Sequence, residues 1–155
     1  MIGELGDIGM TQKVEQDIVK IRTDKGYKSI LILDDERDIT TTFRTILESD
    51  LISKGNLPLR FKVYTSNNPE QFLTDFEPGL YDLLLIDINM PGMDGFELSR
   101  RLLEKDLNLR ICFMTSGEIN YRAMREVHTV MSIGCFITKP ISAEDLINKV
   151  KMELE

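Results

Sequence analysis

The 155-residue chain has no tryptophan, one histidine and two cysteines, and no apolar run approaches the roughly 18 to 20 residues of a membrane-spanning helix. The first 25 residues mix charged with apolar side chains and lack the apolar block of a signal peptide. Basic residues are the scarcer charge, since 19 Lys and Arg face 26 Asp and Glu, giving a net charge of −7. This excess of acid argues against a surface that grips nucleic acid or an anionic membrane. We therefore expect a cytoplasmic protein without a direct nucleic-acid or membrane partner.

The few cysteines and the single histidine exclude further classes of site. Cys112 and Cys135 lie inside apolar stretches, without CxxC spacing and without a neighbouring histidine. We interpret them as small buried apolar residues and predict neither a disulfide framework nor a zinc site. His128 follows Val127 in a segment of helical periodicity, and we do not expect it to take part in phosphoryl transfer.

What the chain does contain is a regular alternation of two patterns. Five short runs rich in Ile, Leu and Val are too short for helices and suit strands that are covered on both faces. They lie at 29–33, 60–65, 83–86, 110–114 and 135–138. Between them, apolar residues recur with helical spacing, and Asn68, Asp94 and Ser142 each begin a helix-capping pattern. This alternation predicts an α/β fold, a doubly wound parallel sheet in three layers with helices on both faces.

The length and the 42% hydrophobic content fit one globular domain. Residues 1–27 lie outside the alternating pattern, so we divide the chain into a leader at 1–27 and a domain at 28–155. Val14, Ile18 and Ile21 have helical spacing, so a short amphipathic helix is plausible there. It would either pack on the domain or fray, or serve as a helix that binds a partner or a second copy of the chain.

Polar residues follow four of the predicted strands at their carboxyl ends, which meet at one edge of a parallel sheet. Asp34 and Asp35 follow the first strand, Asp87 the third, Thr115 the fourth and Lys139 the fifth. Three converging carboxylates repel one another unless a cation compensates them.

Mg²⁺ is the natural compensating ion, because it prefers carboxylate oxygens together with water and a phosphate oxygen. We expect Asp35 and Asp87 as direct ligands, Asp34 as a ligand through water, and Asn89 as a ligand through its main-chain carbonyl. The strand-end lysine and hydroxyl would supply contacts for an incoming phosphoryl group. The pattern therefore predicts a phosphoryl-transfer site.

Four stretches together resemble the receiver domain of two-component response regulators, in particular the single-domain chemotaxis type. They are ILILDDE at 30–36, LLLIDINMPGMDG at 83–95, FMTS at 113–116 and FITKP at 136–140. Each is weak alone, but their order and their places at strand ends are specific. The resemblance covers residues 28–155 and implies a flavodoxin-like five-stranded sheet in the order 2-1-3-4-5.

The resemblance also implies a role for each residue at the predicted site. Asp87 would be the phosphoacceptor, with Lys139 and Thr115 contacting phosphoryl oxygens and Mg²⁺ as the cofactor, for which Mn²⁺ or Ca²⁺ could substitute. Thr115 and Phe136 would form the switch, and Pro140 would follow a cis peptide bond. In the family, the side chains at the positions of Asn89 and Gly117 tune dephosphorylation, and Gly117 leaves one of these positions without a side chain. The lifetime of the phosphoryl group is therefore not predicted.

The implied partners are a sensor histidine kinase or histidine phosphotransfer protein, and a downstream target. The target would bind the face formed by residues 120–134, the strand at 135–138 and the last helix. No enzymatic turnover is expected beyond self-phosphorylation and slow self-dephosphorylation, in a monomer or weak homodimer.

Three alternatives remain open. A haloacid-dehalogenase-like phosphatase also uses a strand-end aspartate and Mg²⁺, but it needs a second acid where this chain has Asn89. A receiver-like interaction module could act without phosphate. A flavodoxin-like cofactor binder needs a phosphate-cradling loop after the first strand, where this chain has acids.

Overall fold

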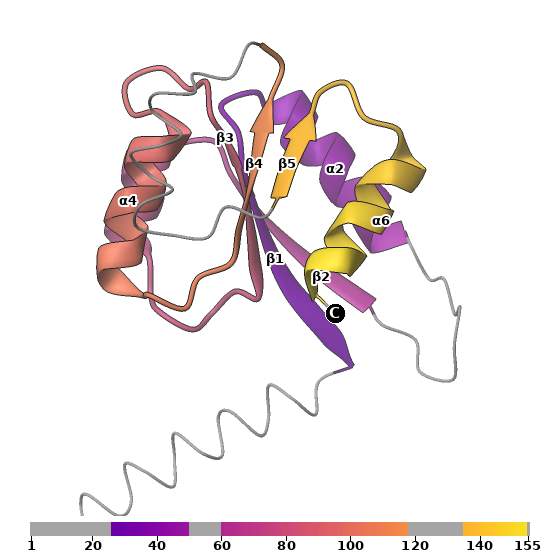
Figure 1. Cartoon of the computed structure of the whole chain (residues 1–155), viewed down its shortest axis with the longest axis horizontal. Helices are drawn as coiled ribbons and strands as arrows, with labels where there is room; N and C mark the ends of the chain where they lie inside the picture. The colour runs from indigo at the N-terminus through magenta and orange to yellow at the C-terminus, as the bar shows by residue number, and fades with distance from the viewer. Residues whose placement is uncertain (1–25, 50–59, 118–134, 155) are drawn as a thin grey trace, which may run out of the picture.

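The computed structural model describes residues 26–49, 60–117 and 135–154. These residues form a parallel sheet flanked by helices (Figure 1). The elements are β1 (Tyr27–Leu33), α2 (Arg37–Ser49), β2 (Arg60–Ser66), α3 (Pro69–Asp75), β3 (Leu83–Asp87), α4 (Gly95–Lys105), β4 (Ile111–Thr115), β5 (Cys135–Thr138) and α6 (Ala143–Leu154). Within the described ranges, no helix is long and apolar enough to cross a bilayer.

The sheet has five parallel strands in the order β2-β1-β3-β4-β5. The predicted fold class and strand order are therefore confirmed. Every residue of β3 and β4 is buried, because inner strands of such a sheet are covered on both faces.

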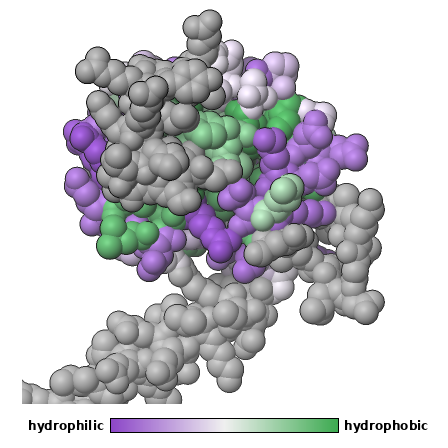
Figure 2. Space-filling model, viewed as in Figure 1, coloured by the Kyte–Doolittle hydropathy of each residue, from purple (hydrophilic) through white to green (hydrophobic). Residues whose placement is uncertain are grey.

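The strands divide their side chains between two apolar layers. In β1, Leu31 and Leu33 pack on the side of α3 and α4, whereas Ile30 and Ile32 pack on the side of α2 and α6. Figure 1 shows α4 on one side of the sheet, with α2 and α6 on the other. In the same view the exposed surface over α6 is mostly hydrophilic (Figure 2). Its buried residues, Leu146 and Val150, belong to the apolar layer on this side of the sheet.

The three predicted helix caps are present. Oδ1 of Asn68 accepts a hydrogen bond from the main-chain N–H of Gln71, and Oδ1 of Asp94 accepts one from Glu97. Oγ of Ser142 accepts one from the main-chain N–H of Asp145. Each cap satisfies a donor that the first helical turn leaves unpaired.

The cysteine prediction needs a correction. Cys112 and Cys135 are buried, as expected, but they form a disulfide. Parallel pairing of β4 with β5 makes the two residues direct neighbours, with their Cα atoms 4.6 Å apart. Their separation of 23 residues in the sequence gives no sign of this register.

Several predictions fall outside the described residues. These are the amphipathic leader helix within 1–27 and the segment 120–134 with His128. Tyr27, the last residue of the predicted leader, is the first residue of β1.

Candidate functional site at the carboxyl ends of the strands

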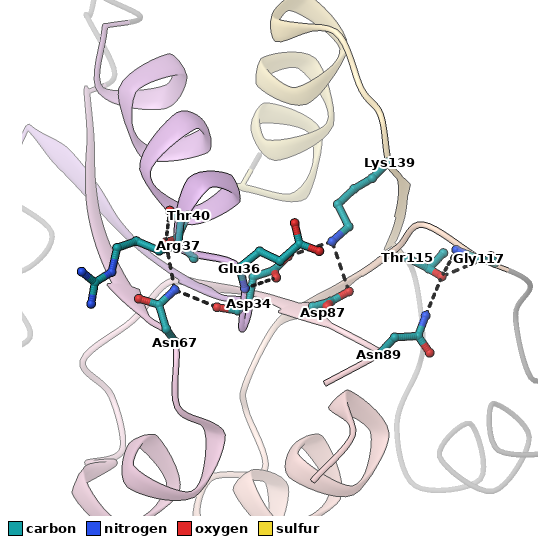
Figure 3. A network of polar contacts seen from close by, with 10 residues as sticks. All are labelled: Asp34, Glu36, Arg37, Thr40, Asn67, Asp87, Asn89, Thr115, Gly117 and Lys139. Atoms are coloured by element: carbon teal, nitrogen blue, oxygen red, sulfur yellow. Dashed lines mark hydrogen bonds and ion pairs between the residues drawn. The ribbon is translucent and has the colours of Figure 1, made fainter. Parts of the chain in front are cut away.

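The carboxyl ends of β1, β3, β4 and β5 bring four predicted residues to one edge of the sheet (Figure 3). Asp34, Asp87 and Thr115 are almost completely buried, and the Lys139 side chain is 8% exposed. Buried charged groups are costly unless they are paired or coordinate an ion. This grouping therefore calls for a chemical explanation.

Three acidic side chains converge here. Asp34, Asp35 and Asp87 each offer a carboxylate oxygen within 4.8 Å of the others. Asp35 is exposed, whereas the other two are buried. The cluster is therefore reached from solvent on the side of Asp35.

The Asp34 carboxylate has hydrogen-bond partners for both oxygens. Oδ1 accepts from the main-chain N–H of Glu36 at 2.9 Å, and Oδ2 accepts from Nζ of Lys139 at 2.8 Å. These two contacts fix the side chain against the β1–α2 loop and against the residue that follows β5.

The Asp87 carboxylate is less well compensated. Its Oδ1 is buried and makes no hydrogen bond with the other described residues, although Nζ of Lys139 lies 3.4 Å away. Burial and the negative charge of Asp34 raise the pKa of Asp87 to about 6, and Lys139 offsets part of this increase. Burial by itself lowers the pKa of Lys139, but the hydrogen bond to Asp34 and the charges of both buried aspartates outweigh it, so this pKa is raised.

The donor set fits a hard divalent cation. Three carboxylates lie together, Lys139 pairs with two of them, and a buried oxygen of Asp87 has no hydrogen-bond donor among the described residues. Mg²⁺ and similar ions prefer such oxygen ligands. Asn89 lies two residues beyond Asp87, and its main-chain carbonyl stays a predicted ligand.

Thr115 lies on β4 and Phe136 on the adjacent strand β5, where Phe136 pairs with Phe113 and Thr115 pairs with Thr138. The Thr115 hydroxyl lies 3.5 Å from Nδ2 of Asn89 and 3.2 Å from the main-chain N of Gly117. Phe136 is half-buried, and its ring centre lies 5.8 Å from that of Phe113. The main-chain N–H of Lys139 donates to the Thr115 carbonyl, and the Lys139–Pro140 peptide bond is cis. The predicted switch residues therefore lie on adjacent strands, β4 and β5.

Gly95 permits a close approach beneath Asp87. A Cβ atom at this position would lie 2.3 Å from the Asp87 carbonyl oxygen, so that no other residue fits without movement of the backbone. The main-chain N–H of Gly95 also donates to the Ile88 carbonyl. The start of α4 thus packs directly against the end of β3.

Sequence reasoning missed one residue next to the acidic cluster. Nδ2 of Asn67 donates to the Asp34 carbonyl at 2.8 Å and to Oγ1 of Thr40 at 3.1 Å (Figure 3). An asparagine after a strand is usually assigned to a turn. The sequence marks Asn68 as the start of a capping pattern but offers no signal that links Asn67 to the acidic loop.

The geometry defines a buried, acidic, cation-compatible site on a doubly wound sheet, and comparison with known proteins gives the family. Residues 30–151 match the response regulator receiver domain. The chain belongs to this family.

Curated relatives include the cyclic di-GMP phosphodiesterase response regulator RpfG of Xanthomonas campestris, 30% identical over 118 residues, covering 76% of this chain and 29% of that protein. The transcriptional regulatory protein ResD of Bacillus subtilis is 29% identical over 122 residues, which are 79% of this chain and 46% of that protein. The chain thus spans less than half of the length of these two relatives.

Solved structures with the same fold include a CheY-like receiver domain protein from Methanospirillum hungatei, with a TM-score of 0.68 and 24% identity over 83% of this chain and 94% of that one. The response regulator TrrA from Thermotoga maritima, solved in complex with Mg²⁺ and BeF, has a TM-score of 0.64 and 26% identity over 82% of this chain and 99% of that one.

Proposed function

We propose that this chain is a phosphoacceptor receiver in which Asp87 takes up a phosphoryl group. The donor would be a phosphohistidine on a sensor kinase or phosphotransfer protein, or a small acyl phosphate. The observation that carries the proposal is the buried Asp87 Oδ1, which has no hydrogen-bond partner among the described residues and lies 3.4 Å from Nζ of Lys139.

In the transfer, a carboxylate oxygen of Asp87 forms a bond to phosphorus. The bond from phosphorus to the donor's nitrogen or oxygen breaks, and the electron pair leaves with the donor. A phosphohistidine donor whose other ring nitrogen is protonated departs as neutral imidazole, and an acyl phosphate departs as a carboxylate. Lys139 pairs with one phosphoryl oxygen, and the Thr115 hydroxyl donates to another.

Asp35 and Asp87 would hold Mg²⁺ directly, Asp34 would hold it through water, and Asn89 would contribute its main-chain carbonyl. Bound Mg²⁺ supplies positive charge that offsets the carboxylates and orients the phosphoryl oxygens. Mn²⁺ or Ca²⁺ could take the same place. The complex of TrrA with Mg²⁺ and BeF supports this assignment by similarity.

Phosphorylation would act by shifting populations of a protein-binding surface. Thr115 would move toward the phosphoryl group, and Phe136 would turn inward beside Phe113. The half-buried position of Phe136 against this ring supports such a change. The affected surface would include residues 120–134, β5 and α6, and would contact a downstream target.

Intact mass spectrometry after incubation with acetyl phosphate tests the proposal. The wild type should gain one phosphoryl group with Mg²⁺ and none with a chelator, and Asp87→Asn should gain none. Equal labelling of Asp87→Asn would overturn the assignment. An unlabelled wild type would favour a phosphate-independent interaction module, and sustained hydrolysis of phosphomonoesters would favour a phosphatase.

A further inference from the structure

The main chain at Asp34 is anchored to the end of β2 on both sides. Its N–H donates to the carbonyl of Ser66 at 3.2 Å, which continues the pairing of β1 with β2. Its carbonyl accepts from the side-chain amide of Asn67 at 2.8 Å. The second contact comes from a side chain and therefore depends on the identity of residue 67.

The hydrogen bond from Asn67 fixes the direction in which the chain continues. Because the peptide group is planar, holding the Asp34 carbonyl also orients the bond to Asp35 and its Cα atom. The Asp35 carboxylate is exposed and makes no hydrogen bond or ion pair with another described residue. Its position therefore depends on the backbone that Asn67 holds.

Asn67 is itself fixed by the first turn of α2. Its amide also donates to Oγ1 of Thr40, and that hydroxyl donates to the Arg37 carbonyl at 3.0 Å (Figure 3). Thr40 is 1% exposed, so that water does not readily replace these contacts. The acidic loop, the end of β2 and the start of α2 are thus joined through one side chain.

We infer that Asn67 is a positioning residue of the cation site, which holds Asp35 in the direction needed to bind a divalent ion. The inference rests on the proposed function, since it assumes that Asp34, Asp35 and Asp87 bind Mg²⁺. Groups that orient metal ligands typically change metal affinity by about 10- to 100-fold when they are removed. Asn67 contacts a backbone carbonyl rather than a ligand atom, so we expect the lower end of this range.

The adjacent asparagine provides a matched control. Asn68 has the same side chain, but its Oδ1 caps α3 by accepting from the N–H of Gln71 at 3.0 Å. Its side chain makes no hydrogen bond to the acidic loop. Asn68→Ala should therefore lower the unfolding free energy and leave the affinity for Mg²⁺ unchanged.

Calorimetric titration with Mg²⁺ separates a positioning role from a structural one. For Asn67→Ala we expect a dissociation constant for Mg²⁺ about tenfold higher than that of the wild type, and for Asp35→Asn a larger loss. An unchanged dissociation constant in folded Asn67→Ala, as in Asn68→Ala, would overturn the inference while leaving the cation site intact. If the wild type does not bind Mg²⁺, the proposed function fails as well.

Thr40→Val provides a second, nearly isosteric variant. It removes the acceptor for Asn67, so the dissociation constant should rise by less than in Asn67→Ala. In the Asn67→Ala background the same substitution should add little, because the two residues act through one contact. If Asn67→Ala does not fold, the single variant Thr40→Val decides: unchanged affinity for Mg²⁺ would overturn the inference.

Discussion

The ends of β1 and β3 each place an aspartate at the same edge of the sheet, yet the two carboxylates have different surroundings. Asp34 and Asp87 are both buried, at 0% and 3% exposure. Both oxygens of Asp34 accept hydrogen bonds, and its backbone is tied to Asn67. Asp87 retains a buried oxygen without a hydrogen-bond partner among the described residues.

This difference shows how neighbours assign roles to one residue type. Each oxygen of Asp34 accepts one hydrogen bond, which fixes the carboxylate and leaves lone pairs that can accept from water around an ion. The open acceptor of Asp87 suits a nucleophile, because a fully hydrogen-bonded carboxylate oxygen is less available to attack phosphorus. The hydrogen bonds that Asp34 receives from Glu36, Lys139 and Asn67 thus distinguish it from Asp87, the proposed reactive carboxylate.

Removing the Lys139 ammonium group, which pairs with both aspartates, should have the largest effect on stability. Lys139→Met leaves two buried carboxylates without their positive partner, and breaking a buried ion pair in this way costs about 3–5 kcal/mol. We expect that loss in the unfolding free energy at pH 7 without Mg²⁺, measured by urea denaturation. Added Mg²⁺ should restore more stability to the variant than to the wild type, and an unchanged unfolding free energy would contradict the described pairing.

Replacing Asp87 with a neutral residue should raise the unfolding free energy, whereas replacing Lys139 lowers it. The pKa of Asp87 is about 6 in the folded chain and 3.8 ordinarily, so its contribution to stability is complete below pH 3.8 and is lost as the pH rises through 6. Without Mg²⁺ at pH 7.5, Asp87→Asn should therefore raise the unfolding free energy by on the order of 2–3 kcal/mol.

Denaturation at a series of pH values checks this prediction. The advantage of Asp87→Asn should shrink as the pH falls from 7.5 to about 4, because wild-type Asp87 then becomes neutral. A constant difference between the two proteins across this range would show that burial does not disfavour the charged form of Asp87.

A smaller effect is expected from the packing beneath Asp87. Gly95→Ala places a methyl group against the Asp87 carbonyl, and overpacking of this kind costs about 1–3 kcal/mol. Gly117→Ala is the matched control on the same edge, since among the described residues its Cβ atom would meet only Nδ2 of Asn89, at 3.9 Å. Thermal denaturation should show a lower midpoint for Gly95→Ala alone. Similar midpoints for both variants would contradict the close contact of α4 with β3.

The sequence predicts the parallel α/β fold and the grouping of Asp34, Asp87, Thr115 and Lys139 because both follow from local patterns. Apolar runs define the strands, and polar residues directly after them must meet at one edge. The prediction that Cys112 and Cys135 form no disulfide was wrong, because their pairing depends on the register of two strands. The contact of Asn67 with Asp34 depends likewise on how the end of β2 lies against the β1–α2 loop.

Mapping of the modified residue tests the central claim most directly. Acetyl phosphate with Mg²⁺ is followed by borohydride reduction, which converts an aspartyl phosphate to homoserine, and by peptide mass spectrometry. We predict homoserine at position 87 and unmodified aspartate at positions 34 and 35. Homoserine at position 34, whether alone or together with homoserine at position 87, would contradict the assignment of Asp87 as the reactive carboxylate.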